Sequence, residues 1–181
     1  FLVILYPIIG LILARLAFGY ATMHLVFPAA AGFALLGPLA AIGLYELSRQ
    51  REMGRSPTAF AALNVVDAKS FNGIVALGLI LLGIFVAWMA VAAALYQSVF
   101  GAAQPQSASA FIDQVLFTSR GQELIFKGCG IGFIFALLVL AISTFSFPLM
   151  VDADRDVSVA TAVRTSVRVM AENPATMGLW G

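Results

Sequence analysis

Residues 73–96 read GIVALGLILLGIFVAWMAVAAALY and contain no charged side chain. An α-helix rises about 1.5 Å per residue, so about 20 apolar residues are enough to cross the hydrocarbon core of a bilayer. Every backbone N–H and C=O group in that core must be satisfied within the protein, which favours a helix over an open strand. The run therefore predicts a transmembrane helix.

Apolar runs of similar length lie on both sides of this one. We expect spans at about 1–19, 25–47 and 124–150, and the start of another span at about 175. A tight connection at about 20–24 joins the first two. These runs predict an all-α protein, a polytopic helical transmembrane bundle.

The composition agrees with this fold class. The 181 residues are 61% hydrophobic and 10% charged, whereas a soluble domain carries about 25% charged residues. A net charge of +1 gives no basic field for nucleic acid. Cys129 is the only cysteine, so an intrachain disulfide and a multi-thiolate metal site are both excluded.

The two ends of the chain suggest a piece of a longer protein. Phe1 opens directly on an apolar run with no charged region before it, so we expect a membrane span there rather than a signal peptide. The chain stops at Gly181 just as a new apolar segment begins. We expect six spans in the full protein.

Two charged connections each contain signals for a short helix. Ser56-Pro57 in the connection 49–72 offers an N-cap followed by proline at the first helical position. Ser158 begins a similar helix in the connection 152–175. In this second helix, apolar and charged side chains occupy different faces: Val159, Val163, Val167 and Met170 on one, Arg164, Arg168 and Glu172 on another. The pattern is typical of an interfacial amphipathic helix, and packing against the cytoplasmic ends of the protein's own spans is the alternative.

Positive charges predict the orientation. Lys and Arg residues concentrate in the connections 49–72 and 152–175, whereas the Gln/Ser/Ala-rich connection 97–123 holds only Arg120. By the positive-inside rule the two charged connections face the cytoplasm, in a bacterial inner membrane. We expect contacts with phospholipid head groups from Arg49, Arg51, Arg155, Arg164 and Arg168.

The order of span, charged turn, short helix and span occurs twice, over 25–96 and 124–181. Both copies have the same orientation, which predicts a parallel repeat rather than an inverted one.

Two segments carry a family resemblance: FPAAAGFALLGPLAAIGLYELSRQREMG (27–54) and FALLVLAISTFSFPLMVDADRDVSVATAVRTSVRVMAENPATM (135–177). The most specific pieces are Gly37-Pro38, the stretch 43–48, Phe147-Pro148 and Asn173-Pro174. With their spacing, these segments resemble the bacterial integral membrane proteins grouped as domain of unknown function 2189. The resemblance implies a membrane protein without defined catalytic residues. A cytochrome-oxidase-like label on some members suggests association with a respiratory complex.

The residues themselves indicate no catalytic, cofactor or metal site. His24 is the only histidine, so the haems and copper of a catalytic oxidase subunit cannot be ligated, and we expect it to be interfacial or structural. The run Asp152, Asp154 and Asp156 resembles a calcium loop, but Val157 and Val163 stand where glycine and glutamate are required.

Ionisable residues within the spans are candidates for function, and here they lie near span ends. They are Arg15, Glu46, Glu123 and Lys127. Anchoring at the head groups and pairing at helical spacing account for them. We expect no enzyme.

Small residues mark the best candidate contact surface. Gly128, Gly130 and Gly132 lie in one span, and Gly128-xxx-Gly132 has the spacing of closely packed helices. The leading hypothesis is a non-catalytic accessory subunit that packs against other membrane-protein subunits, of respiratory type. The alternative is a small transporter or channel with a cavity between the repeats near Pro38 and Pro148.

Overall fold

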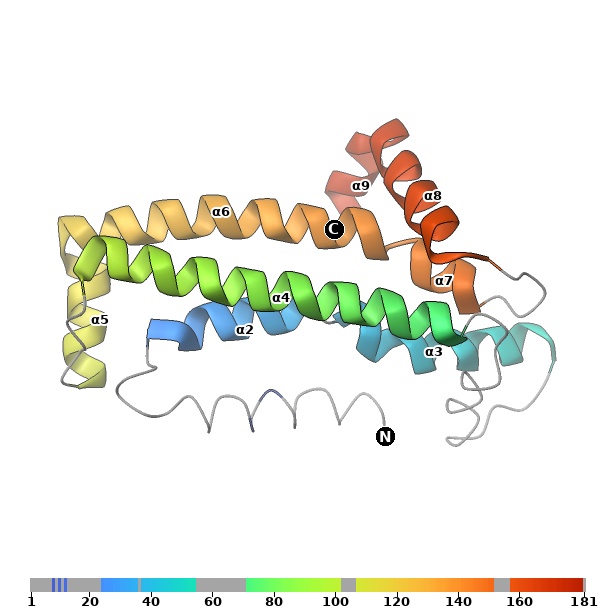
Figure 1. The fold of residues 1–181 in the computed structure, drawn as a ribbon, viewed down its shortest axis with the longest axis horizontal. Helices are drawn as coiled ribbons and strands as arrows, with labels where there is room; N and C mark the ends of the chain where they lie inside the picture. The colour runs from blue at the N-terminus through green and yellow to red at the C-terminus, as the bar shows by residue number, and fades with distance from the viewer. Residues whose placement is uncertain are drawn as a thin grey trace. The chain divides into compact units, whose positions relative to one another are not determined.

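A computed structural model of the chain describes residues 8, 10, 12, 24–35, 37–54, 71–101, 107–151 and 157–180. These residues form helices and contain no strand, which confirms the predicted all-α fold (Figure 1). The helices are α2 (Val26–Leu35), α3 (Gly37–Glu52), α4 (Phe71–Phe100), α5 (Ala108–Phe117), α6 (Ser119–Ser143), α7 (Ser146–Val151), α8 (Val159–Glu172) and α9 (Pro174–Trp180).

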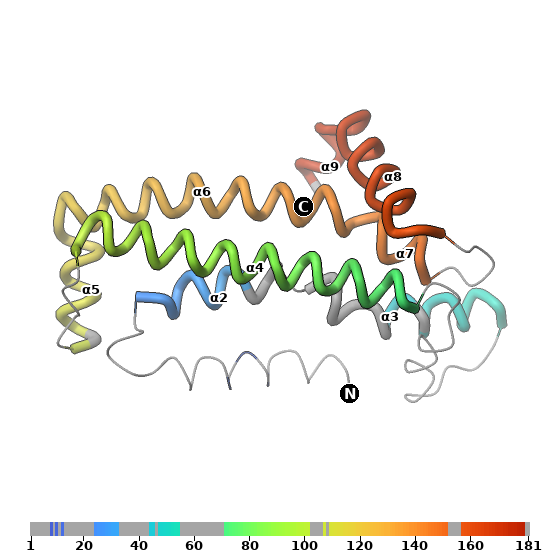
Figure 2. The backbone as a smooth tube through the Cα atoms, in the orientation of Figure 1, coloured from blue at the N-terminus to red at the C-terminus, as the bar shows by residue number. Residues whose placement is uncertain are grey.

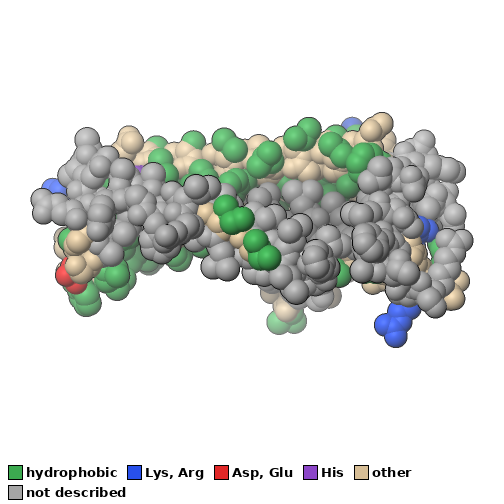
Figure 3. Space-filling model, turned by 90° about the horizontal axis from the view of Figure 1, so that it is seen from below, with side chains coloured by type: hydrophobic (Ala, Val, Ile, Leu, Met, Phe, Trp, Pro, Cys, Tyr) green, Lys and Arg blue, Asp and Glu red, His purple; other side chains and the backbone are tan. Residues whose placement is uncertain are grey.

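Within the described residues, two helical stretches are long and apolar enough to cross a membrane, namely α4 and Ser119–Val151. The second stretch is hardly buried within the chain, and Phe126 and Phe133 on α6 are 86% and 63% exposed. Figure 3 shows hydrophobic side chains over much of the coloured surface and few charged ones. An exposed apolar surface of this kind suits hydrocarbon rather than water.

The helix bounds extend and subdivide the predicted spans. The run 73–96 lies within α4, and the run 124–150 covers most of α6 and α7. The run 25–47 corresponds to α2 and α3. The expected span 1–19 lies outside the described residues except at 8, 10 and 12, and so does the short helix expected after Ser56. One helix was missed: α5 lies within the connection 97–123, which we predicted as a loop.

The chain divides into two compact units. The first comprises residues 1–3, 36–82 and 137–181, and the second comprises 4–35 and 83–136. Because α4 and α6 are long, each contributes one part to each unit.

The first unit is organised around the break between α6 and α7. In an unbroken helix the Phe145 N–H would donate to the Ala141 carbonyl, but here the Ser166 hydroxyl of α8 lies between them. It accepts from the Phe145 N–H at 3.2 Å and donates to the Ala141 carbonyl at 2.7 Å. Ser166 is fully buried. A side chain inserted into the helical ladder is a recognised cause of a helix break.

Apolar side chains close the core of this unit. Leu77 of α4, Phe147 and Met150 of α7, and Ala162 of α8 are all fully buried. A Cβ added at Gly73 would clash with the Met150 side chain. The absence of a side chain there lets α4 approach α7 closely.

The second unit contains α2, the later part of α4, α5 and the first part of α6. From α4 the chain passes into α5 and then turns back into α6 (Figure 2). Thr118 caps the start of α6, because its hydroxyl accepts from the Gly121 N–H at 3.0 Å. Gly121 is buried, and an added Cβ would strike the Val115 carbonyl. Glycine therefore permits the sharp turn between α5 and α6.

Candidate functional site: an apolar cavity in the second unit

An open cavity of about 630 Å³ lies in the second unit. Four segments contribute to its wall: the start and middle of α2, the end of α4, the apolar face of α5 and the first half of α6. The described residues lining it are His24, Phe27, Pro28, Ala31, Gly32, Trp88, Ala92, Leu95, Tyr96, Phe111, Ile112, Val115, Leu116, Leu124, Ile125, Gly128, Cys129, Gly132, Phe133 and Ala136. No charged side chain is among them.

Trp88 holds the deeper part of the wall together. Its indole Nε1 donates to the Pro28 carbonyl at 2.8 Å, which links α4 to α2. A Cβ added at Gly32 would lie 2.6 Å from the Phe85 ring and 2.8 Å from the Trp88 ring. On the other side, a Cβ at Gly132 would lie 3.1 Å from the Trp88 ring. Glycine on α2 and on α6 thus makes room for one large indole.

Aromatic rings and two polar atoms gather at the other end of the cavity. The His24 and Tyr96 rings stack with centroids 4.3 Å apart and an interplanar angle of 22°. The Tyr96 ring also lies 6.3 Å from Phe111 of α5 and 5.2 Å from Phe100. Offset and tilted ring pairs at these distances are favourable.

The two polar atoms at this end have no hydrogen-bond partner. His24 Nδ1 and Tyr96 Oη are both buried and unpaired in the part of the chain that the structure describes. Leaving a buried polar atom unsatisfied costs about 1–3 kcal/mol. Such an atom in the wall of a cavity is a reason to expect a ligand or ordered water.

His24 precedes the predicted span 25–47, and its environment favours the neutral imidazole. Burial lowers the pKa of His24 below its usual value of 6.5, because desolvation penalises the charged form. At neutral pH this side chain therefore offers one donor nitrogen and one acceptor nitrogen.

The two ends of the cavity lie at different depths of the predicted spans. Tyr96 ends the predicted span 73–96, and His24 directly precedes the span 25–47. Trp88 lies two helical turns deeper along α4, about 12 Å at the rise of an α-helix. The polar end of the cavity is thus at the predicted membrane boundary, and the apolar end lies toward the hydrocarbon.

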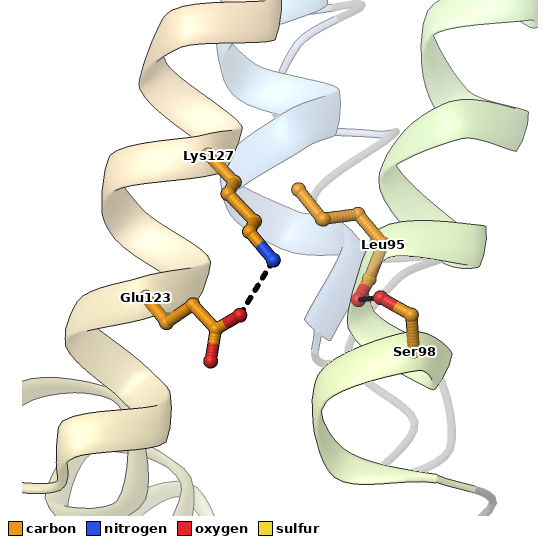
Figure 4. A network of polar contacts seen from close by, with 4 residues as sticks. All are labelled: Leu95, Ser98, Glu123 and Lys127. Atoms are coloured by element: carbon orange, nitrogen blue, oxygen red, sulfur yellow. Dashed lines mark hydrogen bonds and ion pairs between the residues drawn. The ribbon is translucent and has the colours of Figure 1, made fainter.

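The ion pair predicted on α6 forms outside the cavity. The Lys127 ammonium contacts the Glu123 carboxylate at 2.5 Å, and both side chains are about half exposed (Figure 4). The two side chains point toward one another, and neither lines the cavity. A pair this exposed anchors the helix end weakly.

The three predicted contact glycines separate into two groups. Gly132 lies against Trp88, and a Cβ at Gly128 would lie 3.8 Å from the Leu95 side chain, so both face α4. A Cβ at Gly130 would meet no atom within 4 Å. Gly130 therefore takes no part in the contact between α4 and α6.

Among the arginines predicted at the lipid surface, Arg51, Arg164 and Arg168 are exposed and Arg49 is half-buried. Arg155 lies outside the described residues. On α8 one side is buried in the protein, and Val167 of the predicted apolar face lies on the exposed side. Ala162 and Ser166 are buried, whereas Val167 is 42% exposed beside the two arginines.

Sequence reasoning singled out His24 without its partner, and it missed Trp88 and Tyr96. A signal was present, because Trp88, Ala92 and Tyr96 recur every four residues and share one helix face. Within the described ranges, no group of three or more His, Cys, Asp or Glu residues could hold a metal ion.

Comparison with known proteins places the chain in a family. The model of the family described as "Predicted integral membrane protein (DUF2189)" matches residues 26–152, more than half of the chain. The chain belongs to this family. A search of curated proteins and a search of solved structures gave no significant match. As a DUF2189 member the protein is an integral membrane protein, and the matched residues contain most of the cavity-lining segments.

Proposed function

We propose that this protein is a non-catalytic membrane subunit that binds an amphipathic, lipid-soluble molecule in the cavity formed by α2, α4, α5 and α6. One observation carries the proposal: an apolar cavity of about 630 Å³ with two unpartnered polar atoms at one end. Ligand cavities have volumes of about 300–1,000 Å³ and combine an apolar lining with a few polar groups.

The exposed apolar side chains at the rim of the cavity support entry of a ligand from the hydrocarbon of the bilayer. Phe27 is 71% exposed, and Ile125 and Phe133 at the rim are also exposed apolar side chains. A void beside packed side chains forfeits dispersion contacts, so an apolar chain that fills it is favoured over an empty space. A molecule whose polar head lies at His24 and Tyr96 would extend its tail toward Trp88.

Membership of a larger complex, of the respiratory type, remains part of the proposal. The exposed apolar side of α6, where Phe126 and Ile134 lie, supports contact with another membrane subunit or with lipid. The transporter alternative needs a path near Pro38 and Pro148. The cavity gives it no support, because its described lining lies within 24–32, 88–96 and 111–136.

Orientation is proposed on charge alone. The connections 49–72 and 152–175 would face the cytoplasm of a bacterium and 97–123 would face outward, in a multi-pass inner-membrane protein. The polar end of the cavity then lies in the outer leaflet.

Quenching of Trp88 fluorescence tests the proposed function. The chain has two tryptophans, so Trp180→Phe leaves Trp88 as the single reporter. Reconstitution with a phosphatidylcholine brominated along its acyl chains should quench Trp88, because an acyl chain that enters the cavity from the bilayer contacts the indole while its head group stays outside. Gly128→Leu should at least halve this quenching by filling the cavity.

Gly130→Leu is the matched control, since it makes the same change two residues away on the open side of α6. The Trp88 fluorescence of this variant should be quenched as strongly as that of the parent protein. Equal quenching in both leucine variants would show that the chains reach Trp88 from bulk lipid, and it would remove the proposal.

A further inference from the structure

We propose that the cavity takes a lipid with an uncharged ring head group bearing carbonyl or hydroxyl oxygens, of the prenyl-quinone type, whose oxygens pair with Tyr96 and His24. This rests on the proposed function and narrows it from an amphiphile to one chemical class. The inference concerns binding and involves no electron transfer.

The charge of the wall selects against a phospholipid head group. No charged side chain is among the described lining residues. Lys127 is turned to Glu123 on the exposed side of α6. A phosphate brought into this wall would lose hydration without a counter-charge, whereas an uncharged head loses much less.

The rings at the polar end favour a flat head. His24, Tyr96 and Phe111 present aromatic surfaces at the same end of the cavity, and Tyr96 lies within stacking distance of the other two. A planar ring finds stacking partners there. A branched glycerol backbone would not.

The two unpartnered atoms, His24 Nδ1 and Tyr96 Oη, can form hydrogen bonds with a ring head group that bears either carbonyl or hydroxyl oxygens. The Tyr96 hydroxyl donates to a carbonyl or accepts from a hydroxyl, and a neutral imidazole also offers both modes. Both atoms are covered by neighbouring groups. The head group therefore reaches them only after a side chain at this end moves.

The depth of the cavity in the predicted membrane also favours a ring head group with a long apolar tail. The polar end coincides with the boundary of the predicted spans, and the apolar part extends about 12 Å along α4 to Trp88. A ring held at that boundary leaves its prenyl tail in the cavity and in hydrocarbon beyond.

The Trp180→Phe protein provides the test, with a decyl-substituted benzoquinone as the probe and brominated phosphatidylcholine for comparison. The quinone should quench Trp88 saturably after correction for absorption. Tyr96→Phe removes one hydroxyl and should weaken its apparent Kd about 3- to 10-fold, the range expected for one hydrogen bond. His24→Phe keeps a stacking ring and should weaken it similarly, and quenching by the brominated lipid should be unchanged in both variants.

The outcomes separate the two proposals. Quenching by brominated lipid without saturable quenching by the quinone keeps the proposed function and overturns the ring-head inference. Saturable quinone binding that Tyr96→Phe and His24→Phe leave unchanged also overturns it. If both probes quench Trp88 equally in Gly128→Leu and Gly130→Leu, the cavity binds no ligand and both proposals fail.

Discussion

Trp88 shows how a single residue can organise a membrane unit. Its indole N–H is satisfied by the Pro28 carbonyl, and its ring fits between Gly32 and Gly132. In a bilayer the hydrophobic effect contributes little to helix association. Close packing at small residues and hydrogen bonds between helices therefore contribute a larger share of the stability. Sequence alone predicted Gly132 by its spacing from Gly128, but it did not indicate Gly32. It also could not identify the ring that the two glycines accommodate, because that ring belongs to a distant segment.

The glycine spacing leads to a paired prediction at this scale. Gly132→Ala should destabilise the protein by about 1 kcal/mol, because its Cβ would lie 3.1 Å from Trp88. Gly130→Ala should be neutral or stabilising, since its Cβ meets open space and alanine favours helix. Thermal unfolding in detergent, together with the emission of Trp88, compares the two. A lower midpoint for Gly130→Ala than for Gly132→Ala would contradict the described packing.

Ser166 gives a second prediction, in the first unit. Ser166→Ala removes the hydroxyl that bonds both the Phe145 N–H and the Ala141 carbonyl. We expect a loss of about 1–3 kcal/mol in the free energy of unfolding, because both groups are left unsatisfied. Thr165→Ala is the control, since its hydroxyl bonds only the Thr161 carbonyl of its own helix. Equal effects of the two variants on denaturation in detergent would argue against the bridge.

At the scale of elements, the long apolar helices were easier to predict from sequence than the short ones. Residues 73–96 are apolar throughout, so α4 was predicted from composition alone. The predicted run 124–150 ends within a residue of the end of α7 and begins five residues after the start of α6. Its division at Thr144 and Phe145 depends on a hydroxyl from α8, which no local pattern reveals. α5 was missed because the connection around it is rich in Gln, Ser and Ala. Its signal was Ser107, which caps the helix by accepting from the Ala110 N–H.

α8 has one side buried in the protein and one side exposed. Its buried side, with Ala162 and Ser166, packs within the first unit, while Val167, Arg164 and Arg168 are exposed. A spin label at Val167→Cys in a Cys129→Ser background should report the depth of the lipid head groups, because apolar and basic side chains lie together there. A label at Glu172→Cys should be accessible to an aqueous relaxing agent. Full aqueous accessibility at 167 would leave α8 as a helix packed on the protein alone.

At the scale of the whole molecule, the family match and the exposed apolar side chains both indicate a membrane protein. Burial within the chain is low on α6, where Phe126, Phe133 and Ile134 are exposed. Either lipid or another subunit covers that surface. The proposed subunit role favours a protein partner, at least over part of it.

Native sizing decides between these coverings. After gentle solubilisation, a subunit should migrate with a larger complex, identified by mass spectrometry and by its visible absorption spectrum. Disrupting the exposed side of α6 with Phe126→Ala and Ile134→Ala should release it, because large apolar side chains dominate such contacts. Leu179→Ala, at an equally exposed apolar residue of α9, is the comparison and should leave the complex intact. Migration of the unaltered protein alone or as a small homo-oligomer would rule out the accessory role. It would leave ligand binding as the function to pursue, because the cavity is built from one chain and needs no partner to complete its described wall.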